Sequence, residues 1–389
     1  MDVKKAQGAD KGEPVTIVGA GPAGLACAIV LARAGRAVVV REWHGDVGHR
    51  FHGDYQGLEN WSDDGDVLDE LAQAGIAPDF MHHPVHRGIA YDAWGASYPV
   101  VGRRPLYYLV RRGGTPDSLD HGLLAQARSH GVTVRFNDRV MTTDGPCVLG
   151  IGPRVAAAIA TGYVFKTPLE DGNWVAFNNA LAPLGYAYLL IHAGRGTVAS
   201  CMFTDFKRQQ LYVERTLAFF RDKVGLVMDE ARPFGGYANF RLPRRGGRGG
   251  HRVIGEQAGF QDALAGFGMR YALRSGILAA RSLLEGVSYE RLWRRELLPL
   301  LRTGVANRFI FNTVGERGWR WALEGLSRSD TELKLRRLYR PSWLTRLLYP
   351  LAYWRYAGPL RDPSCNHVDC ACVWCTHGGH GAAPAWHPT

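Results

Sequence analysis

The sequence predicts an α/β protein: a Rossmann-like dinucleotide-binding domain, an inserted antiparallel-sheet domain and a helical C-terminal region. A glycine-rich turn joins a short apolar strand to a helix near the N-terminus, and a second such turn opens another helix about 240 residues later. Between them, residues 160–245 alternate apolar and polar side chains, as antiparallel strands do. The composition is ordinary for a globular protein, with 46% hydrophobic and 21% charged residues, which excludes a disordered chain, a collagen and a coiled coil.

The expected domain boundaries follow these changes of pattern. They are a disordered N-terminus (1–13), a dinucleotide-binding domain in two parts (14–159 and 246–288), the sheet domain between them (160–245), a basic aromatic helical region (289–362) and a Cys/His-rich tail (363–389). We expect a cytoplasmic protein, because the first 14 residues lack the apolar segment of a secretory signal. The sequence has no stretch of about 18 uninterrupted apolar residues, so a membrane-spanning helix is not expected.

The first glycine-rich turn has the full context of a dinucleotide site. A strand is expected at Val15–Val18, a helix from Leu25 to Ala34 and a second strand at Val38–Val40. The acid that closes this unit is placed to accept hydrogen bonds from ribose hydroxyls, and the glycines permit a tight turn and close approach of a pyrophosphate. The predicted cofactor-binding residues here are Gly19, Gly21, Ala23, Gly24 and Glu42. This motif alone does not separate FAD from NAD.

The second glycine-rich turn suits a cofactor longer than one nucleotide. A predicted strand, Val253–Ile254, runs into a Gly-Glu pair, and a helix is expected from Met269 to about Leu284. The stretch resembles the GDxxGxxxPxxGxG segment of flavoproteins of the hydroxylase and geranylgeranyl reductase type, with Glu256 in place of Asp and Ala263 in place of Pro. In those families the acid binds the ribityl chain and the helix N-terminus faces the flavin. The resemblance therefore implies FAD, bound by Gly255, Glu256, Gly266, Phe267, Gly268 and Met269.

A third segment, residues 108–136, is expected to form a strand, an Arg-rich turn, a helix from Ser118 to about His130 and another strand. The same families carry an arginine before this helix that approaches the FAD phosphates. Arg111 or Arg112 matches that position. A solvated pair of arginines in a turn is an equally good interpretation.

Two further segments bear on the type of reaction. Hydroxylases of this fold carry an Asp-Gly pair at the end of one strand, and the equivalent strand here, 148–154, has Ile151 where the Asp would be. Residues 182–190 resemble the PxxYxWxF motif of geranylgeranyl reductases. Pro183 and Tyr186 match this motif, while Tyr188 replaces the tryptophan, and these three are the predicted substrate-binding residues.

The resemblance implies an FAD-dependent oxidoreductase that reduces a C=C bond of an isoprenoid or another hydrophobic, lipid-like small molecule. Its electron donor is left open among NAD(P)H, a ferredoxin and other reductants. The proton donor is expected among His52, Tyr186 and His192, and His52 lies in a stretch, 50–61, interpreted as a polar turn. The alternatives are an FAD-dependent monooxygenase of the hydroxylase type and a non-catalytic flavin electron carrier or scaffold.

The net charge of +11 is concentrated near the C-terminus, where residues 291–361 hold fifteen Lys or Arg and five Asp or Glu. Within residues 338–356, Trp and Leu recur at helical spacing and arginines flank them. This pattern is typical of peripheral binding to an anionic membrane surface, here the inner face of the membrane. A helical subdomain packed on the flavin domain is an equal alternative, and nucleic acid is a weaker one because no binding module is recognisable.

The tail contains four cysteines within eleven residues. Thiolates at this density can bind a metal, and we expect a structural Zn²⁺ rather than an iron–sulfur cluster. The predicted ligands are Cys365, Cys370, Cys372 and Cys375, spaced C-x4-C-x-C-x2-C. A tail without metal is the alternative.

Overall fold

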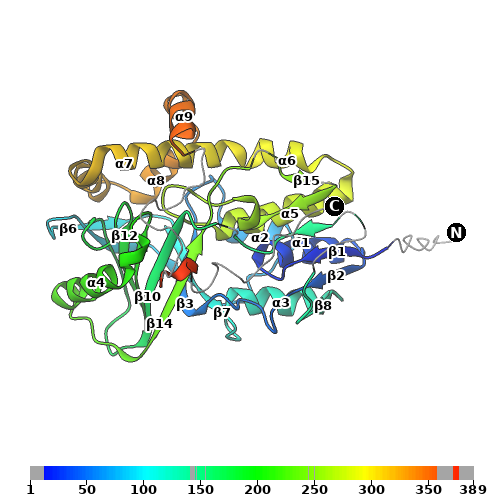
Figure 1. Cartoon of the computed structure of the whole chain (residues 1–389), viewed down its shortest axis with the longest axis horizontal. Coiled ribbons are helices and arrows are strands. Elements are labelled where there is room, and N and C mark those ends of the chain that lie inside the picture. The colour runs from blue at the N-terminus through cyan, green and yellow to red at the C-terminus, as the bar shows by residue number, and fades with distance from the viewer. Residues whose placement is uncertain are drawn as a thin grey trace.

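The computed structural model describes residues 13–140, 145, 147–153, 155–243, 245–248, 250–356 and 371–375. Within these residues the chain forms a six-stranded, a seven-stranded and a three-stranded sheet, together with a layer of C-terminal helices (Figure 1). The α/β fold expected from the sequence is confirmed.

The six-stranded sheet carries the first glycine-rich turn. Its neighbours run parallel except for the outermost pair, β15–β16. In spatial order the strands are β15 (Gly247–Arg248), β16 (His251–Val253), β9 (Val148–Leu149), β1 (Val15–Val18), β2 (Val38–Arg41) and β8 (Thr133–Arg135). Because β1 has β2 on one side and β9 on the other, the crevice at their carboxyl ends is the place where such sheets bind ligands.

Helices α1 (Pro22–Arg33), α3 (Leu119–Ser129) and α5 (Met269–Glu285) accompany this sheet, with α1 in contact with both others. The backbones of α1 and α5 approach very closely, since a Cβ on Gly276 would lie 2.0 Å from the carbonyl oxygen of Ala23. The main hydrophobic core lies among these elements and includes fully buried Ile17, Leu25, Ile29, Phe260 and Trp293.

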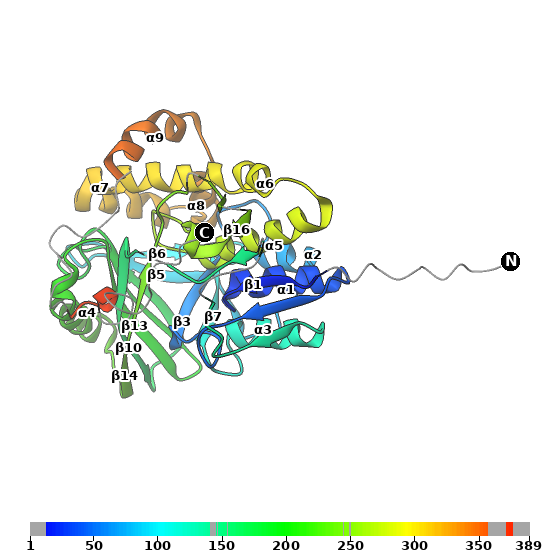
Figure 2. The same cartoon turned by 45° about the vertical axis from the view of Figure 1, so that its right-hand side comes forward.

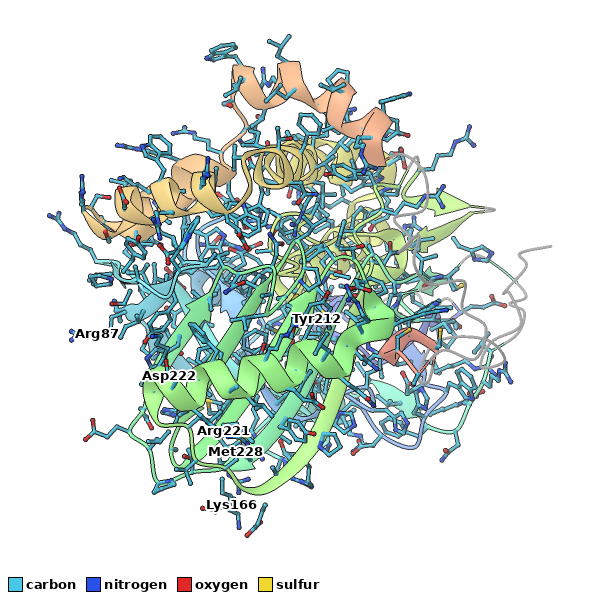
Figure 3. The ribbon with its side chains drawn as sticks, turned by 60° about the vertical axis from the view of Figure 1, so that its left-hand side comes forward. Arg87, Lys166, Tyr212, Arg221, Asp222 and Met228 are labelled. Carbon is cyan, nitrogen blue, oxygen red and sulfur yellow. The ribbon has the colours of Figure 1, made fainter. Side chains whose placement is uncertain are left out.

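The seven-stranded sheet is antiparallel except for the β11–β5 pair. In order, its strands are β14 (Asp229–Ala238), β10 (Ala158–Lys166), β13 (Arg195–Met202), β12 (Tyr186–His192), β11 (Gly172–Ala176), β5 (Arg87–Tyr91) and β6 (Ser97–Val101). A 3-10 turn, Phe206–Arg208, leads into α4 (Gln209–Val224), which crosses one face of the sheet (Figure 3). The three-stranded antiparallel sheet consists of β3 (His52–Glu59), β7 (Tyr107–Gly113) and β4 (His82–Val85), and α2 (Val67–Gln73) follows β3.

After α5 the chain forms four helices that make a separate layer (Figure 2). They are α6 (Tyr289–Glu296), α7 (Leu298–Ser327), α8 (Thr331–Tyr339) and α9 (Trp343–Tyr356). Helix α7 is interrupted at Gly315, where φ is +58°, and it contacts α6, α8, α9 and β6. Among the helices described, none is both long and apolar enough to cross a bilayer.

The structure corrects several local expectations. Residues 50–61 are not a turn, because His52–Glu59 is strand β3, and the two arginines at 111 and 112 lie within β7 rather than in a turn. The seven-stranded sheet takes β5 and β6 from the stretch assigned to the dinucleotide-binding domain, and the expected sheet domain also contains α4. The strand expected over 148–154 is limited to Val148–Leu149. Residues 1–12 of the expected disordered N-terminus lie outside the described residues.

Candidate functional site

A cavity of about 1530 Å³ begins at the carboxyl ends of the parallel strands. It is lined by Val18 and Gly19 at the end of β1, by Arg41 and Glu42 at the end of β2, and by Gly150 after β9. From there it continues past the second glycine-rich turn and beneath α7 and α8. Ligand pockets commonly measure roughly 300–1,000 Å³, so this cavity can hold more than one small molecule.

The three glycines of the first turn have different structural roles. Gly19 has φ of +103°, and a Cβ there would lie 2.3 Å from the carbonyl oxygen of Gly150. A Cβ on Gly24 would lie 2.1 Å from the carbonyl oxygen of Gly19. Gly21 lines the cavity with φ of −77°, and a Cβ there would meet no atom within 4 Å. The protein itself needs Gly19 and Gly24, whereas the space beside Gly21 is open to a ligand.

Two helix N-termini line this cavity, and neither has a side-chain cap. Helix α1 begins after Gly21 and α5 after Gly268, without a capping hydrogen bond and without an acid in the first turn. By contrast, α2, α3, α6 and α8 are each capped by an Asp or Ser side chain. Free amide donors at a helix N-terminus bind anions and developing negative charge, so both ends are suited to a phosphate or a polar ring edge.

Glu42 lies where the adenosine half of a dinucleotide would end. Its carboxylate accepts hydrogen bonds from the backbone N–H of Ala20 at 2.8 Å and of His44 at 3.0 Å. Each oxygen can accept a second hydrogen bond, as a pair of ribose hydroxyls requires. Nearby, the guanidinium of Arg139 lies 4.4 Å from the ring centre of Trp43, and both line the cavity.

The two arginines of β7 differ in position. Arg112 lines the cavity, where it forms a buried two-pronged ion pair with Asp120 at 2.9 and 3.0 Å and lies 3.9 Å above the ring of Phe51. Arg111 pairs with Asp117 instead and does not line the cavity. The residue that could meet a phosphate is therefore Arg112, whose orientation is held by Asp120.

The second Gly-Glu pair also lies in the cavity wall. Gly255 has φ of +60°, and the Glu256 carboxylate accepts a hydrogen bond from Arg50 at 2.9 Å. The Arg50 guanidinium lies 5.2 Å from the ring centres of both Phe51 and Tyr237. The orientation of the Glu256 side chain is thus held by an arginine that no sequence motif singled out.

The loop before α5 is braced from the C-terminal layer. Gly266, Phe267, Gly268 and Met269 all line the cavity. Arg308 of α7 is buried and donates hydrogen bonds to the carbonyl oxygens of Ala263 at 2.9 Å, Leu264 at 2.6 Å and Leu184 at 2.6 Å. Burial lowers the pKa of Arg308 to about 10, although the nearby Asp262 raises it, so the side chain remains charged near neutral pH. One arginine therefore joins α7, this loop and the turn before β12.

Tyr186 and Tyr188 on β12 line the cavity beyond this loop. The Tyr186 hydroxyl donates a hydrogen bond to the carbonyl oxygen of Ala265 at 2.6 Å. Burial raises the pKa of both tyrosines well above the ordinary value, so both hydroxyls are protonated at neutral pH. Pro183 is buried in the preceding turn and does not line the cavity.

The far part of the cavity is largely apolar. Its wall comes from the seven-stranded sheet and from the undersides of α7 and α8. The apolar lining residues include Ile89, Val100, Phe177, Phe311, Trp319, Leu323, Leu326, Leu335 and Leu338.

The two histidine candidates lie in different places. His52, at the start of β3, is exposed and lines the cavity. His192, at the end of β12, is hydrogen-bonded to Asp171 at 2.6 Å, stacks on His83 at 4.3 Å and does not line the cavity. The structure therefore brings His52 and Tyr186 to the cavity but leaves His192 outside it.

Residues 371–375 of the tail pack back against the sheet beside α4 (Figure 3). The Gln209 side chain donates to the carbonyl oxygen of Ala371 at 2.5 Å and accepts from the N–H of Val373 at 3.3 Å. Trp374 lines the cavity and meets the ring of Tyr237 edge-on at 4.8 Å between centres. A segment more than 130 residues after β14 thus completes one wall.

The predicted metal site is only partly described. Cys372 is buried in an apolar cluster with Ile159, Met202 and Phe206, and Cys375 packs at its edge. Cys365 and Cys370 lie outside the described residues. Among the residues that are described, no three Cys, His, Asp or Glu side chains gather as metal ligands would. A zinc site in the tail stays a prediction.

Sequence reasoning missed four cavity residues, namely Arg50, Trp61, Tyr237 and Trp374. It also missed Arg308, which does not line the cavity but braces the loop before α5. For Arg50 a signal existed, because it follows Glu42 by eight residues in the same glycine- and histidine-rich connection. The others come from segments whose place beside the cavity depends on tertiary packing.

Comparisons with known proteins agree with this architecture. A family model described as an NAD(P)-binding Rossmann-like domain matches residues 17–69. No curated protein matches the sequence.

Solved structures match over most of the chain. A geranylgeranyl bacteriochlorophyll reductase-like protein from Thermoplasma acidophilum is 16% identical, with 89% of this chain and 97% of that chain covered and a TM-score of 0.60. A flavin-dependent brominase is 14% identical, with 88% of this chain and 98% of that chain covered and a TM-score of 0.61. The p-nitrophenol 4-monooxygenase from Pseudomonas putida DLL-E4 is 15% identical, with 87% of this chain and 97% of that chain covered and a TM-score of 0.56. The chain therefore shares the fold of flavoproteins that include a reductase-like protein, a halogenase and a monooxygenase.

Proposed function

We propose that this protein is an FAD-dependent oxidoreductase that reduces a C=C bond of an isoprenoid or another lipid-like substrate. The observation that carries the proposal is the continuity of the cavity. It runs from two glycine-rich turns with free helix N-termini into a space lined by Phe311, Leu323 and other apolar side chains. A dinucleotide at the turns would face a hydrophobic substrate at the far end.

The residues present fit FAD. The open space at Gly21 and the uncapped N-terminus of α1 suit the pyrophosphate, and Glu42 suits the adenosine ribose. Arg112 supplies a fixed positive charge, and the N-terminus of α5 suits the polar edge of the flavin. When bound and reduced, FAD would supply the hydride for alkene reduction.

Within this site Tyr186 is the group that we propose as proton donor. Tyr186 lines the cavity, and its hydroxyl donates a hydrogen bond to the carbonyl oxygen of Ala265, in the loop that precedes α5. Because its pKa is raised by burial, the hydroxyl keeps its proton until a stronger base forms beside it. The apolar walls orient the alkene and exclude water from it.

Purified protein tests the cofactor and the reaction in turn. It should be yellow, and dithionite should bleach its flavin absorption bands. Mass spectrometry of lipids incubated with the reduced protein should then show a gain of two hydrogens, and the same assay with NAD(P)H or a ferredoxin identifies the electron donor. Colourless protein that takes up no FAD would refute the cofactor.

Two tyrosine variants separate chemistry from packing. Tyr186→Phe removes the proposed donor, so the rate of product formation should fall by roughly 100-fold or more, while FAD binding is retained. Tyr188→Phe is the matched control, because Tyr188 lies on the same strand and lines the same cavity. Equal losses in both variants would exclude Tyr186 as the specific donor.

A monooxygenase is the second candidate, and the fold shared with p-nitrophenol 4-monooxygenase favours it. Against it, position 151 carries Ile, whose backbone N–H donates to the Gln257 side chain at 2.9 Å, instead of a carboxylate. An added oxygen in the product would support this candidate. A flavin that is reoxidised only by a protein partner would instead indicate an electron carrier.

A further inference from the structure

Helix α9 presents an apolar face that nothing in the described part of the chain covers. It is the outermost element of the C-terminal layer in all three views (Figures 1, 2 and 3). Trp343, Leu347 and Trp354 keep 76%, 69% and 78% of their surface exposed. Isolated exposed apolar residues are ordinary on proteins, but several large ones on one short helix mark a contact surface.

The helical positions show that these side chains form one stripe. At about 100° per residue, Trp343, Leu347, Leu351 and Trp354 fall within an arc of about 80°. The two tryptophans lie about 16 Å apart along the axis. The opposite side of α9 is buried against the protein, with Thr345 and Ala352 covered and Tyr349 packed in the cluster that includes Val305 of α7.

Positive charge borders the stripe on both sides. Arg346 lies about 60° to one side of Trp343 and Arg355 about 120° to the other, and both are exposed. Neither forms an ion pair with a described residue. From Leu333 to Tyr356 the chain has six Lys or Arg and no Asp or Glu. The charged residues of this segment that border the stripe are therefore all positive.

We propose that α9 is an interfacial helix that docks this protein on an anionic lipid surface. Tryptophan and leucine side chains would enter the boundary between headgroups and acyl chains, and the arginines would meet anionic headgroups. With 14 residues, α9 can lie in that boundary but is too short to span a bilayer. A second copy of the chain fits less well, because a two-fold contact through this stripe would bring Arg346 and Arg355 of both copies together without an acid between them.

This placement also bears on the proposed substrate, and this step alone rests on the proposed function. Helix α9 packs on α7, and α7 lines the apolar cavity through Phe311, Trp319 and Leu323. Docking through α9 would therefore bring the lipid surface to the helical layer that forms the cavity wall. A lipid-like substrate would then be concentrated on that side of the protein.

Binding of the purified protein to vesicles tests the proposal without any activity measurement. The probes are vesicles of phosphatidylcholine alone and vesicles with about one third phosphatidylglycerol, sedimented at low and high salt. We expect binding to the anionic vesicles, weakened steeply by salt because exposed charges are screened. No binding to either vesicle, or equal binding to both, would overturn the proposal.

Charge and apolar variants assign the binding to α9. Arg346→Gln with Arg355→Gln should weaken binding to anionic vesicles about 30-fold at low salt. The matched control, Lys166→Gln with Arg221→Gln, removes the same charge at the end of the molecule opposite α9 and should have little effect (Figure 3). Equal losses in the two charge variants would mean that net charge, not α9, causes binding.

The apolar variant, Trp343→Ser with Trp354→Ser, should also lose vesicle binding. Its unfolding midpoint and flavin content should match the wild type, because both side chains are exposed and lie outside the cavity lining. A wild type that is dimeric in gel filtration, ignores vesicles and becomes monomeric in this variant would overturn the proposal in favour of self-association. A colourless protein that still binds vesicles would refute the proposed function and leave the lipid contact intact.

Discussion

Replacing Gly21 by alanine should weaken the binding of FAD without lowering the stability of the protein. The backbone at Gly21 has φ of −77°, which alanine adopts freely, and the added methyl group meets no protein atom within 4 Å. A compatible Gly→Ala change stabilises a protein by about 0.4–1 kcal/mol, because it restricts the unfolded chain. The free energy of unfolding of Gly21→Ala should therefore be unchanged or slightly higher.

The same methyl group would occupy the space in which we place the pyrophosphate of FAD. We expect the dissociation constant for FAD to rise at least about tenfold, which corresponds to about 1.4 kcal/mol. Gly24→Ala is the contrasting variant. Its Cβ would lie 2.1 Å from the carbonyl oxygen of Gly19, about 1.3 Å closer than the 3.4 Å of an ordinary contact. Overpacking of this kind costs roughly 1–3 kcal/mol of stability.

The assay is titration of the apoprotein with FAD, followed by flavin fluorescence, beside urea unfolding of the same samples. Gly21→Ala should lose affinity and keep its unfolding midpoint, whereas Gly24→Ala should unfold at lower urea. The reasoning is refuted if Gly21→Ala binds FAD as tightly as the wild type. It is also refuted if Gly21→Ala is less stable than Gly24→Ala, since the space at Gly21 would then not be open.

Three further outcomes are expected. Arg308→Leu should lower the free energy of unfolding by at least about 3 kcal/mol in urea denaturation, because three carbonyl oxygens lose a buried donor, and a loss under 1 kcal/mol would contradict this. Gly235→Ala places a Cβ 2.4 Å from Val373, so proteolysis of the tail should accelerate, whereas Gly236→Ala, which meets nothing within 4 Å, should leave it unchanged. Burial alone would raise the pKa of Asp92, but hydrogen bonds, first that from Arg320, lower it. The stability that Asp92 contributes should thus be complete above about pH 4 and disappear as the pH falls through the lowered pKa. Unfolding midpoints of wild type and Asp92→Asn should converge in acid, and a constant difference would argue against this ion pair.

The parts of the site that sequence reasoning identified depend on local backbone geometry. Gly19 and Gly24 are required by a positive φ and by close backbone contacts within a few residues, so their spacing is visible in the sequence. The same holds for Gly255, which has φ of +60° at the first position of a 3-10 turn. Such constraints lie within one supersecondary unit and do not depend on what the rest of the chain does.

Other expectations failed because a cavity changes the usual patterns. The density of polar residues in 50–61 predicts a turn, whereas the structure has strand β3 there. His52 and Gln56 are polar because they line a cavity rather than a core. Arg308 and Trp374 reach the site from elements that are distant in sequence. Their places depend on how α7 and the tail pack on the sheet, and one sequence carries no local signal of that packing.

The order in which the walls occur along the chain has a consequence for biogenesis. During synthesis from the N-terminus, the turn at Gly19–Gly24 emerges long before Gly266 and Gly268, and Trp374 emerges later still. A nascent chain that has folded through α5 already contains both glycine-rich turns, while the wall formed by α7, α8 and residues 371–375 does not yet exist. Until those segments dock, the apolar lining faces water, which makes this stage the one most exposed to aggregation or to capture by a chaperone. A dinucleotide present at that stage would bind the two glycine-rich turns before the helical layer covers them. Its binding would stabilise this partly formed site, on which the helical layer then packs.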